Sequence, residues 1–294
     1  MCASVSHQAL LDTLYDIGII PVIQLDETAE AGSLARALIE GGIPCAEVTF
    51  RAAGADEVIS RMRAAYPDML VGAGTVLTTE QAGSAIAAGA QFLVAPGFNR
   101  AVAEYVLGRG VPFFPGVSGT EGIEQAMALG LDTVKFFPAE QSGGLAYLKA
   151  VAAPYAGMRF IPTGGISIEN LAGYLSFDRV VACGGSFMVK KELLARHDYA
   201  AVASACRQAV DQMIALSVDS ITSDEPVGYG TLLQPSGKRE LLLSARSVPR
   251  ALLRLKAKGF LPDPATARTG AGGRLTEISF FNTFGGLPVR LISR

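Results

Sequence analysis

Two kinds of segment alternate along most of the chain. Each unit begins with a short run of apolar, β-prone residues that ends at a glycine, a proline or a polar residue. A segment rich in Ala, Leu, Glu and Arg follows and closes on glycine, as in AEAGSLARALIEGG (29–42) and TEGIEQAMALG (120–130). The first pattern predicts buried strands, and the second predicts helices that end at glycine.

The strand pattern recurs through the first two thirds of the chain. Its runs are IIPVIQ (19–24), CAEVTF (45–50), MLVGAGT (69–75), QFLVAP (91–96), VPFFPG (111–116), TVKFFP (133–138), RFIPTG (159–164) and VVACGG (180–185). Continuously apolar strands separated by helices indicate a parallel sheet covered by helices. Eight such units closed on themselves form an α/β fold, the (β/α)8 TIM barrel, which we predict here. An open doubly wound sheet is the alternative, but no glycine fingerprint follows the first strand.

The pattern changes after residue 216. SVDSITSDEP (217–226) is polar and turn-prone, and we expect a linker there. Beyond it we expect a small α+β, βαβββ-like module, whose segments are GYGTLLQP (228–235), KRELLLSA (238–245), a helical VPRALLRLKAKGF (248–260), a Pro/Gly-rich LPDPATARTGAGG (261–273), RLTEISFFN (274–282) and LPVRLISR (287–294). The predicted domains are therefore 1–216 and 217–294. So small a module cannot bury a large core alone, so we expect it to pack against the barrel or a second copy.

Composition and charge exclude several classes of protein. Half of the 294 residues are apolar and 18% are charged, which excludes a disordered chain. The 25 basic and 27 acidic residues nearly cancel, so we expect no nucleic-acid partner. No apolar run reaches the roughly 18 residues that suggest a membrane span, and the N-terminal sequence lacks a signal-peptide pattern. With four cysteines and no CxxC pair, we expect reduced thiols and a cytoplasmic protein.

The chain has two histidines, His7 and His197, which stand far apart and form no HxxxH or HxH pair. A histidine-based metal site is therefore not expected, although a carboxylate-bound magnesium stays open. Acid–base chemistry would rest mainly on carboxylates, lysines or phosphate groups.

Two charged residues interrupt apolar strands. Lys135 lies within TVKFFP. It either extends its amine to water from a strand end, pairs with a carboxylate inside the barrel, or serves as a desolvated amine that attacks a carbonyl to form a Schiff base. Glu47 lies within CAEVTF, where strand alternation places Glu47, Thr49 and Arg51 on one face. Glu47 either forms a structural ion pair with Lys135 or Arg51, or moves protons for a Schiff-base lysine.

Two glycine doublets follow the last two strands, in PTGGIS (162–167) and CGGS (183–186). Glycines allow backbone N–H groups to approach an anion, and a helix expected to begin at Ser167 adds its positive end. Because these loops form the usual phosphate site of the barrel, the sequence predicts a phosphorylated substrate. In GAGTV (72–76), Thr75 either caps a helix or holds a carboxylate together with Arg51.

A set of short motifs carries a family resemblance. In chain order they are EVTFR (47–51), VGAGTVL (71–77), APG (95–97), PGVS (115–118), VKFFPAE (134–140), PTGGIS (162–167) and GGSF (184–187). Over about residues 8–214 the chain resembles the bacterial 2-keto-3-deoxy-6-phosphogluconate (KDPG) aldolase family, which includes 4-hydroxy-2-oxoglutarate (KHG) aldolase. One departure is Ala52, which stands where the family often has threonine.

The resemblance implies a lyase, a class I aldolase that uses neither cofactor nor metal. Its substrate would be a small 2-keto acid, either KDPG, cleaved to pyruvate and glyceraldehyde 3-phosphate, or KHG, cleaved to pyruvate and glyoxylate. It also implies a homotrimer. By match to the motifs, Lys135 would be the Schiff-base lysine and Glu47 the general acid/base, acting partly through a bound water.

The same match assigns the substrate-binding residues. Arg51 and Thr75 would bind the pyruvyl carboxylate beside Pro96 and Gly97, and Thr163 would face the substrate hydroxyls. The residues expected to bind the phosphate are Gly164, Gly165, Gly185 and Ser186. The C-terminal module resembles one βαβββ half of the vicinal-oxygen-chelate fold. That fold holds a metal with His and Glu, and since this segment has no histidine we expect a non-catalytic, dimerising or regulatory module.

Two other functions are compatible with the residues. One is a phosphate-binding barrel of another reaction type, an isomerase or a synthase, which needs no imine at Lys135. The other is a sensor that binds a sugar acid without turnover. A desolvated lysine beside a carboxylate favours the aldolase, because a protein that only binds has no need for such an amine.

Overall fold

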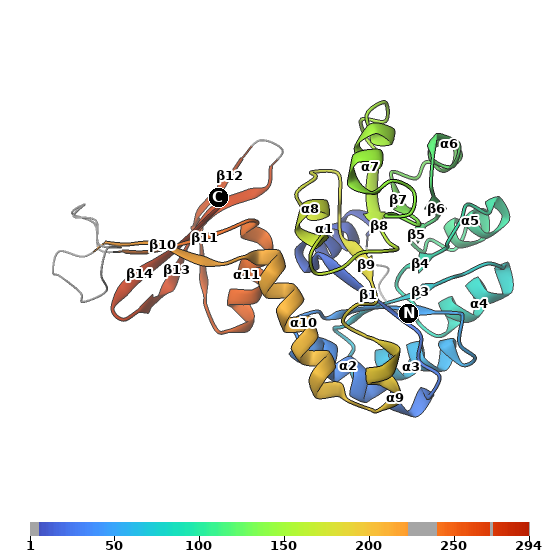
Figure 1. Cartoon of the computed structure of the whole chain (residues 1–294), viewed down its shortest axis with the longest axis horizontal. Coiled ribbons are helices and arrows are strands. Elements are labelled where there is room, and N and C mark those ends of the chain that lie inside the picture. The colour runs from blue at the N-terminus through green and yellow to red at the C-terminus, as the bar shows by residue number, and fades with distance from the viewer. Residues whose placement is uncertain (1–5, 223–239, 271–272, 294) are drawn as a thin grey trace. The chain divides into compact units, whose positions relative to one another are not determined.

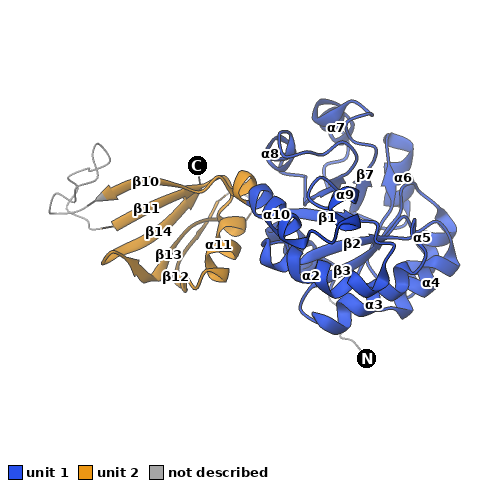
Figure 2. Ribbon diagram, turned by 60° about the horizontal axis from the view of Figure 1, so that its bottom comes forward, with its two compact units in different colours: residues 1–210 blue, residues 211–294 orange. Residues whose placement is uncertain are grey.

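The structure is a computed structural model, and it describes residues 6–222, 240–270 and 273–293. The chain forms two compact units, Met1–Val210 and Asp211–Arg294 (Figure 2). The division falls inside one helix, α10 (Tyr199–Ile214). The assignment of domains to 1–216 and 217–294 stays a prediction.

The first unit is a barrel of parallel strands surrounded by helices (Figure 1). Its strands are β1 (Ile19–Ile23), β2 (Cys45–Thr49), β3 (Leu70–Gly74), β4 (Leu93–Val94), β5 (Phe113–Phe114), β6 (Gly116–Val117), β7 (Thr133–Phe136), β8 (Arg159–Pro162) and β9 (Cys183–Gly185). Each of the eight predicted apolar runs contains one of these strands, and the fifth run, which contains β5, also reaches the first residue of β6. Pro115 separates β5 from β6, yet its carbonyl still accepts a hydrogen bond from the Lys135 N–H.

The strands follow one another around the barrel. One sheet has the order β5-β4-β3-β2-β1-β9, and a second has the order β6-β7-β8. A parallel bridge between Thr163 and Gly184 joins the end of β8 to β9. The sheet therefore returns to the strand beside β1, as the predicted (β/α)8 barrel requires.

Helices occupy the connections between the strands. They are α1 (His7–Ile17), η1 (Thr28–Glu30), α2 (Ala31–Glu40), α3 (Ala55–Ala65), α4 (Thr79–Ala87), α5 (Arg100–Leu107), α6 (Thr120–Ala128), α7 (Gly144–Ala152), α8 (Leu171–Leu175), α9 (Lys191–Ala195) and α10. Local sequence sets several helix ends. The side chains of Ser6, Thr78 and Asn99 cap the first turns of α1, α4 and α5, and Gly18 ends α1 in the left-handed conformation.

The second unit is a five-stranded sheet with one helix. Its elements are β10 (Ser217–Thr222), β11 (Glu240–Ala245), α11 (Val248–Ala257), β12 (Pro262–Thr269), β13 (Leu275–Phe284) and β14 (Leu287–Ser293). The sheet order is β10-β11-β14-β13-β12, with β11 and β14 parallel and the other pairs antiparallel. From β11 to β14 the chain is βαβββ, in agreement with the predicted fold class.

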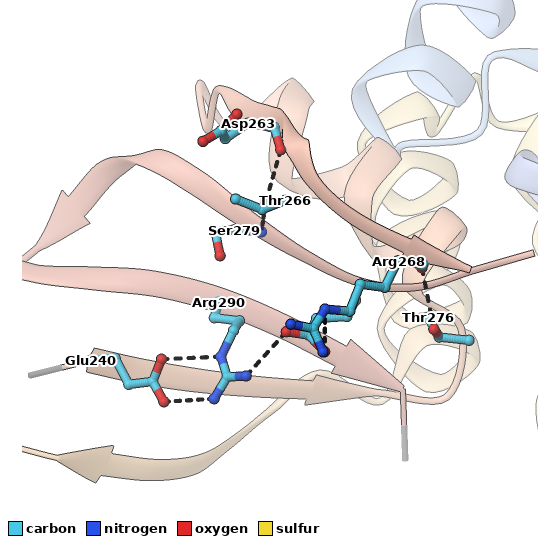
Figure 3. A network of polar contacts seen from close by, with 8 residues as sticks. Glu240, Asp263, Thr266, Arg268, Thr276, Ser279 and Arg290 are labelled. Atoms are coloured by element: carbon cyan, nitrogen blue, oxygen red, sulfur yellow. Dashed lines mark hydrogen bonds and ion pairs between the residues drawn. The ribbon is translucent and has the colours of Figure 1, made fainter. Parts of the chain in front are cut away.

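Strand alternation gives this sheet two different faces. Ile278, Leu291 and Leu243 are buried, as are Ala251 and Leu255 of α11. The opposite face carries a polar network (Figure 3), in which Arg290 binds both carboxylate oxygens of Glu240, at 2.6 and 3.0 Å, and Glu277 at 3.1 Å. Hydrogen bonds from Arg290 to Glu240 are the main cause that raises the pKa of this guanidinium.

One expectation about this region is wrong. Residues 217–222 of the expected linker form β10, which pairs with β11. The Pro/Gly-rich segment contains β12, which among the described strands pairs with β13 alone and is therefore an edge strand. An edge strand needs backbone pairing on one side only, so polar residues and prolines are tolerated there. The segment 228–235 of the expected module lies outside the described residues.

Among the helices of the described ranges, none combines the length and hydrophobicity needed to cross a membrane.

Candidate active site

Lys135 and Glu47 meet inside the barrel. Lys135 comes from β7 and Glu47 from β2, and the Lys135 Nζ lies 3.1 Å from the Glu47 Oε1. Both residues are buried, with 5% of Lys135 and 1% of Glu47 exposed. The Lys135 Nζ also lies 5.5 Å from the centre of the Phe137 ring. The predicted alternative of a Glu47–Arg51 ion pair is not among the contacts of the described residues.

Glycines in β3 make room for this pair. A Cβ on Gly74 would lie 2.2 Å from the Glu47 Oε1, so no larger residue fits there without displacing the carboxylate. A Cβ on Gly72 would lie 2.4 Å from the Phe92 ring. The GAG sequence of this strand is therefore explained by the side chains that pack over it. Sequence reasoning missed the role of Gly74, because the residue it accommodates is on another strand.

A cavity of about 340 Å³ opens over Lys135 at the carboxyl ends of the strands. Its lining residues are Val22, Arg51, Thr75, Pro96, Lys135, Phe137, Thr163, Gly164, Gly165, Ile166, Gly185 and Ser186. The structure thus gathers the predicted site residues except two. Gly97 lines a neighbouring cavity, which shares Pro96 and Phe137 with this one. Glu47 does not line the cavity over Lys135, but its carboxylate contacts the Lys135 amine that does. Val22, Phe137 and Ile166 were not predicted, since apolar residues give no chemical signal.

Arg51 and Thr75 lie on one side of the cavity. The Thr49 hydroxyl donates to the Ile23 carbonyl at 2.8 Å and accepts from the Arg51 Nε at 3.3 Å, which orients the guanidinium. Thr75 has a φ of 55°, an uncommon conformation for a β-branched residue. It does not cap a helix, because α4 is capped by Thr78, whose hydroxyl accepts from the Gln81 N–H. The helix-cap alternative for Thr75 is therefore excluded.

The first glycine doublet forms a tight loop that lines the same cavity. Gly164 and Gly165 have φ values of 94° and 77°, which only glycine adopts readily. The helix expected at Ser167 begins instead at Leu171 and has five residues. The Ser167 N–H donates to the Asn170 side chain at 2.9 Å, so the local structure is a turn. A helix dipole at Ser167 is therefore not part of this site.

The cysteines near the site are buried. Burial, followed by the charge of Glu47, raises the pKa of the Cys45 thiol well above its ordinary range. Cys183 is buried in β9. Their burial indicates that both are unreactive packing residues. Among the described residues, no group of three or more His, Cys, Asp or Glu side chains is arranged to hold a metal ion.

Known proteins match the barrel. Residues 11–205 match the model of the KDPG and KHG aldolase family. The chain belongs to this family. The resemblance found in the sequence is thereby confirmed, and the part of the chain after residue 205 lies outside the match.

Individual members of the KDPG and KHG aldolase family are similar to this chain over almost their whole length. The 2-dehydro-3-deoxy-phosphogluconate aldolase of Treponema pallidum is 49% identical over 201 residues, which cover 68% of this chain and 96% of the relative. The enzyme of the same name from Haemophilus influenzae is 40% identical over 208 residues, covering 71% and 98%.

A solved structure of a family member has the same fold as the barrel. KDPG aldolase from Legionella pneumophila, with pyruvate captured as a covalent carbinolamine intermediate, has a TM-score of 0.65 and 34% identity and covers 68% of this chain and 97% of that one. The predicted barrel fold is confirmed.

Proposed function

We propose that this chain is a class I aldolase that cleaves KDPG to pyruvate and glyceraldehyde 3-phosphate through a Schiff base on Lys135. The observation that carries the proposal is the buried Lys135–Glu47 pair, 3.1 Å apart, beneath a cavity edged by Arg51 and the glycine loop. Family membership supports the same reaction class. KHG, which would yield pyruvate and glyoxylate, is a second substrate that the same pair would process.

The first half of the reaction builds an electron sink. The neutral Lys135 amine attacks C2 of the 2-keto acid and forms a carbinolamine. Glu47 moves protons, partly through a bound water, as the C2 hydroxyl leaves as water and the iminium forms. Glu47 suits this role because its carboxylate already contacts the Lys135 Nζ.

The second half breaks and remakes bonds at C3. A base, for which Glu47 is the proposed group, removes the proton of the C4 hydroxyl, the C3–C4 bond breaks, and its electron pair passes into the iminium to give an enamine. The aldehyde leaves. The enamine takes a proton at C3, and water hydrolyses the resulting iminium to release pyruvate and free Lys135.

The remaining cavity residues would hold the substrate. We assign the pyruvyl carboxylate to Arg51 and Thr75, with Pro96 and Gly97 beside it, because the Thr49 hydroxyl orients the guanidinium at that side. Thr163 would bind the substrate hydroxyls. We assign the phosphate to the backbone amides and hydroxyl of Gly164, Gly165, Gly185 and Ser186, which line the same cavity.

We further propose that the protein is a cytoplasmic homotrimer whose C-terminal unit is accessory. The trimer is what the family resemblance implies. Large apolar side chains are exposed on both units, for example Leu77 and Met127 of the barrel and Phe281 and Phe284 of the second unit, so exposure alone does not assign the interface to either unit.

Reductive trapping tests the proposed mechanism. Sodium borohydride added with pyruvate should attach one lactyl-sized group to Lys135, found by mass spectrometry of peptides. Lys135→Met should abolish both labelling and pyruvate release. Lys149→Met, which removes an exposed amine of α7, should change neither. Absence of labelling at Lys135, together with loss of activity in EDTA, contradicts the proposal and favours another type of barrel enzyme. Labelling without any turnover favours a sensor.

A further inference from the structure

We propose that Tyr174 and Glu140 are positioning residues for the phosphate subsite, and that their hydrogen bond sets the preference for phosphorylated over unphosphorylated substrates. This inference rests on the proposed function, since it concerns the loop assigned to the phosphate. Neither residue lines the cavity over Lys135. They act instead through the Gly164–Gly165 loop, which does.

Tyr174 is a buried donor aimed at Glu140. It lies in α8 with 1% of its surface exposed, and its hydroxyl donates to the Glu140 Oε1. Burial, followed by the hydrogen bond and charge of Glu140, raises the pKa of Tyr174, so the phenol stays protonated at neutral pH. Glu140 is itself exposed to solvent. The Tyr174 hydroxyl therefore holds in one place a carboxylate that solvent would otherwise leave free to turn.

The stem of Glu140 supports the glycine loop. A Cβ on Gly165 would lie 2.6 Å from both the Cβ and the Cγ of Glu140, so these methylene groups pack directly against Gly165. The Glu140 N–H donates to the Gly164 carbonyl at 3.1 Å, and the Ala139 N–H donates to the Thr163 carbonyl at 2.7 Å. The backbone of Ala139 and Glu140 is thus hydrogen-bonded to the backbone of Thr163 and Gly164, at the start of the glycine loop.

The carboxylate end of Glu140 points to another element. A Cβ on Gly144, at the start of α7, would lie 3.3 Å from the Glu140 Oε1 and 3.6 Å from the Tyr174 hydroxyl. The head group is therefore placed between α7 and α8 while the stem contacts Gly165. Without the Tyr174 hydroxyl, the negative charge can swing towards an anion bound at the loop and repel it.

Helix α8 holds the loop from its other end. The Asn170 Nδ2 donates to the Gly165 carbonyl at 3.0 Å, and the Tyr174 N–H donates to the Asn170 carbonyl at 3.2 Å. One turn of helix thus carries both the Asn170 contact and the hydroxyl that binds Glu140. The loop is fixed on two sides by residues that a phosphate would not touch, which is the arrangement expected of a preorganised anion site.

The test separates phosphate binding from Schiff-base formation. In Tyr174→Phe, the KM for KDPG should rise about fivefold, the effect of losing roughly one hydrogen bond. Inhibition by inorganic phosphate should weaken by a similar factor. The pyruvate concentration for half-maximal borohydride trapping at Lys135 should change less than twofold, because pyruvate carries no phosphate. Glu140→Gln keeps an acceptor for the Tyr174 hydroxyl and should retain the wild-type KM.

A matched control is present in the chain. Tyr155 donates to the Glu124 Oε1 at 2.8 Å on the surface, and neither residue lines the cavity. Tyr155→Phe should leave the KM, phosphate inhibition and trapping within twofold of wild type. If Tyr174→Phe does not fold, Glu140→Ala, which removes the stem that packs against Gly165, must raise the KM for KDPG without changing the pyruvate needed for trapping.

Two results overturn the positioning role. One is a Tyr174→Phe enzyme with the same constants as Tyr155→Phe. The other is an equal rise in the KM for KDPG and in the pyruvate needed for trapping, which would indicate general loosening of the barrel. Failure of the wild-type protein to trap pyruvate would instead contradict the proposed function.

Discussion

Gly74 and Glu47 occupy one small volume inside the barrel. Glycine within a strand costs roughly 0.5–1 kcal/mol relative to alanine, so its presence in β3 needs a local reason. The reason is the carboxylate of Glu47, whose Oε1 would lie 2.2 Å from any Cβ at that position. The contact links an apparently structural residue to the proposed proton transfer.

We expect Gly74→Ala to lower kcat for KDPG cleavage at least 100-fold, because the methyl group displaces the carboxylate that moves protons for Lys135. Steady-state kinetics and near-UV circular dichroism measure the effect and the fold. In the control Gly32→Ala, a Cβ meets nothing within 4 Å, and kcat should stay unchanged. Retained activity in Gly74→Ala would mean that Glu47 is not needed where the structure places it.

At this scale the sequence was informative wherever a charge interrupted an apolar strand. Lys135 and Glu47 were predicted as site residues because burying an isolated charge is costly, so each residue needed a partner or a function. Phe137 and Gly74 had no such signal. Their roles depend on which residues of other strands lie against them, and a single segment of sequence does not contain that information.

Among the elements, α1 is tied to the strand ends by a cluster around Asp132. The His7 Nε2 lies 2.9 Å from the Asp132 Oδ1, the Thr133 hydroxyl donates to the same oxygen at 2.8 Å, and Arg159 binds the other oxygen. Burial alone would raise the pKa of Asp132, but the bonds from His7, Thr133 and Arg159 lower it below 3.8. The ionised carboxylate is thus favoured in the folded state.

Because the folded-state pKa is the lower one, Asp132 contributes its stability above pH 3.8, and that contribution is lost as the pH falls through the folded pKa. We expect Asp132→Asn to reduce the free energy of unfolding by about 1 kcal/mol at pH 7, and by progressively less below pH 3.8. Urea unfolding at pH 7 and pH 3 measures both values.

The control for this prediction is Glu40→Gln, which removes a surface ion pair with Arg36 at 3.9 Å and should have little effect at either pH. A loss for Asp132→Asn that stays constant between pH 7 and pH 3 would show that its role does not depend on ionisation.

The strands of the barrel were predictable because each is continuously apolar and ends at a turn residue. The errors concern elements whose stability comes from their neighbours. β10, where a linker was expected, has a polar sequence and exists as an edge strand because β11 offers a backbone partner. α8 starts later than expected because the Ser167 N–H donates a hydrogen bond to the Asn170 side chain, and this bond forms a turn before the helix.

For the whole molecule, the two units raise the question of what the second one does. The family match ends at residue 205, and the relatives are covered almost completely by about two thirds of this chain. All the residues that we assign to the reaction lie in the barrel. The polar network on one face of the five-stranded sheet is formed entirely within the second unit.

We expect a chain that ends at residue 216 to keep the wild-type kcat and KM for KDPG, since every proposed site residue lies in the first unit. Light scattering should give three times the mass of one chain for both the full-length and the shortened protein. A shortened protein that folds but is monomeric or inactive would show that the C-terminal unit is structural and not accessory.

The Lys135–Glu47 contact also has a consequence for how the protein is made. The two residues are 88 positions apart, and they belong to different sheets, β7 in one and β2 in the other. During synthesis, Glu47 leaves the ribosome well before Lys135, and a buried carboxylate without its partner is costly. An ionised Glu47 therefore favours a hydrated interior around β2 until Lys135 is available to pair with it. Competence for the proposed reaction should arise in one late step, when the ring of strands closes and water leaves the space between the two charges.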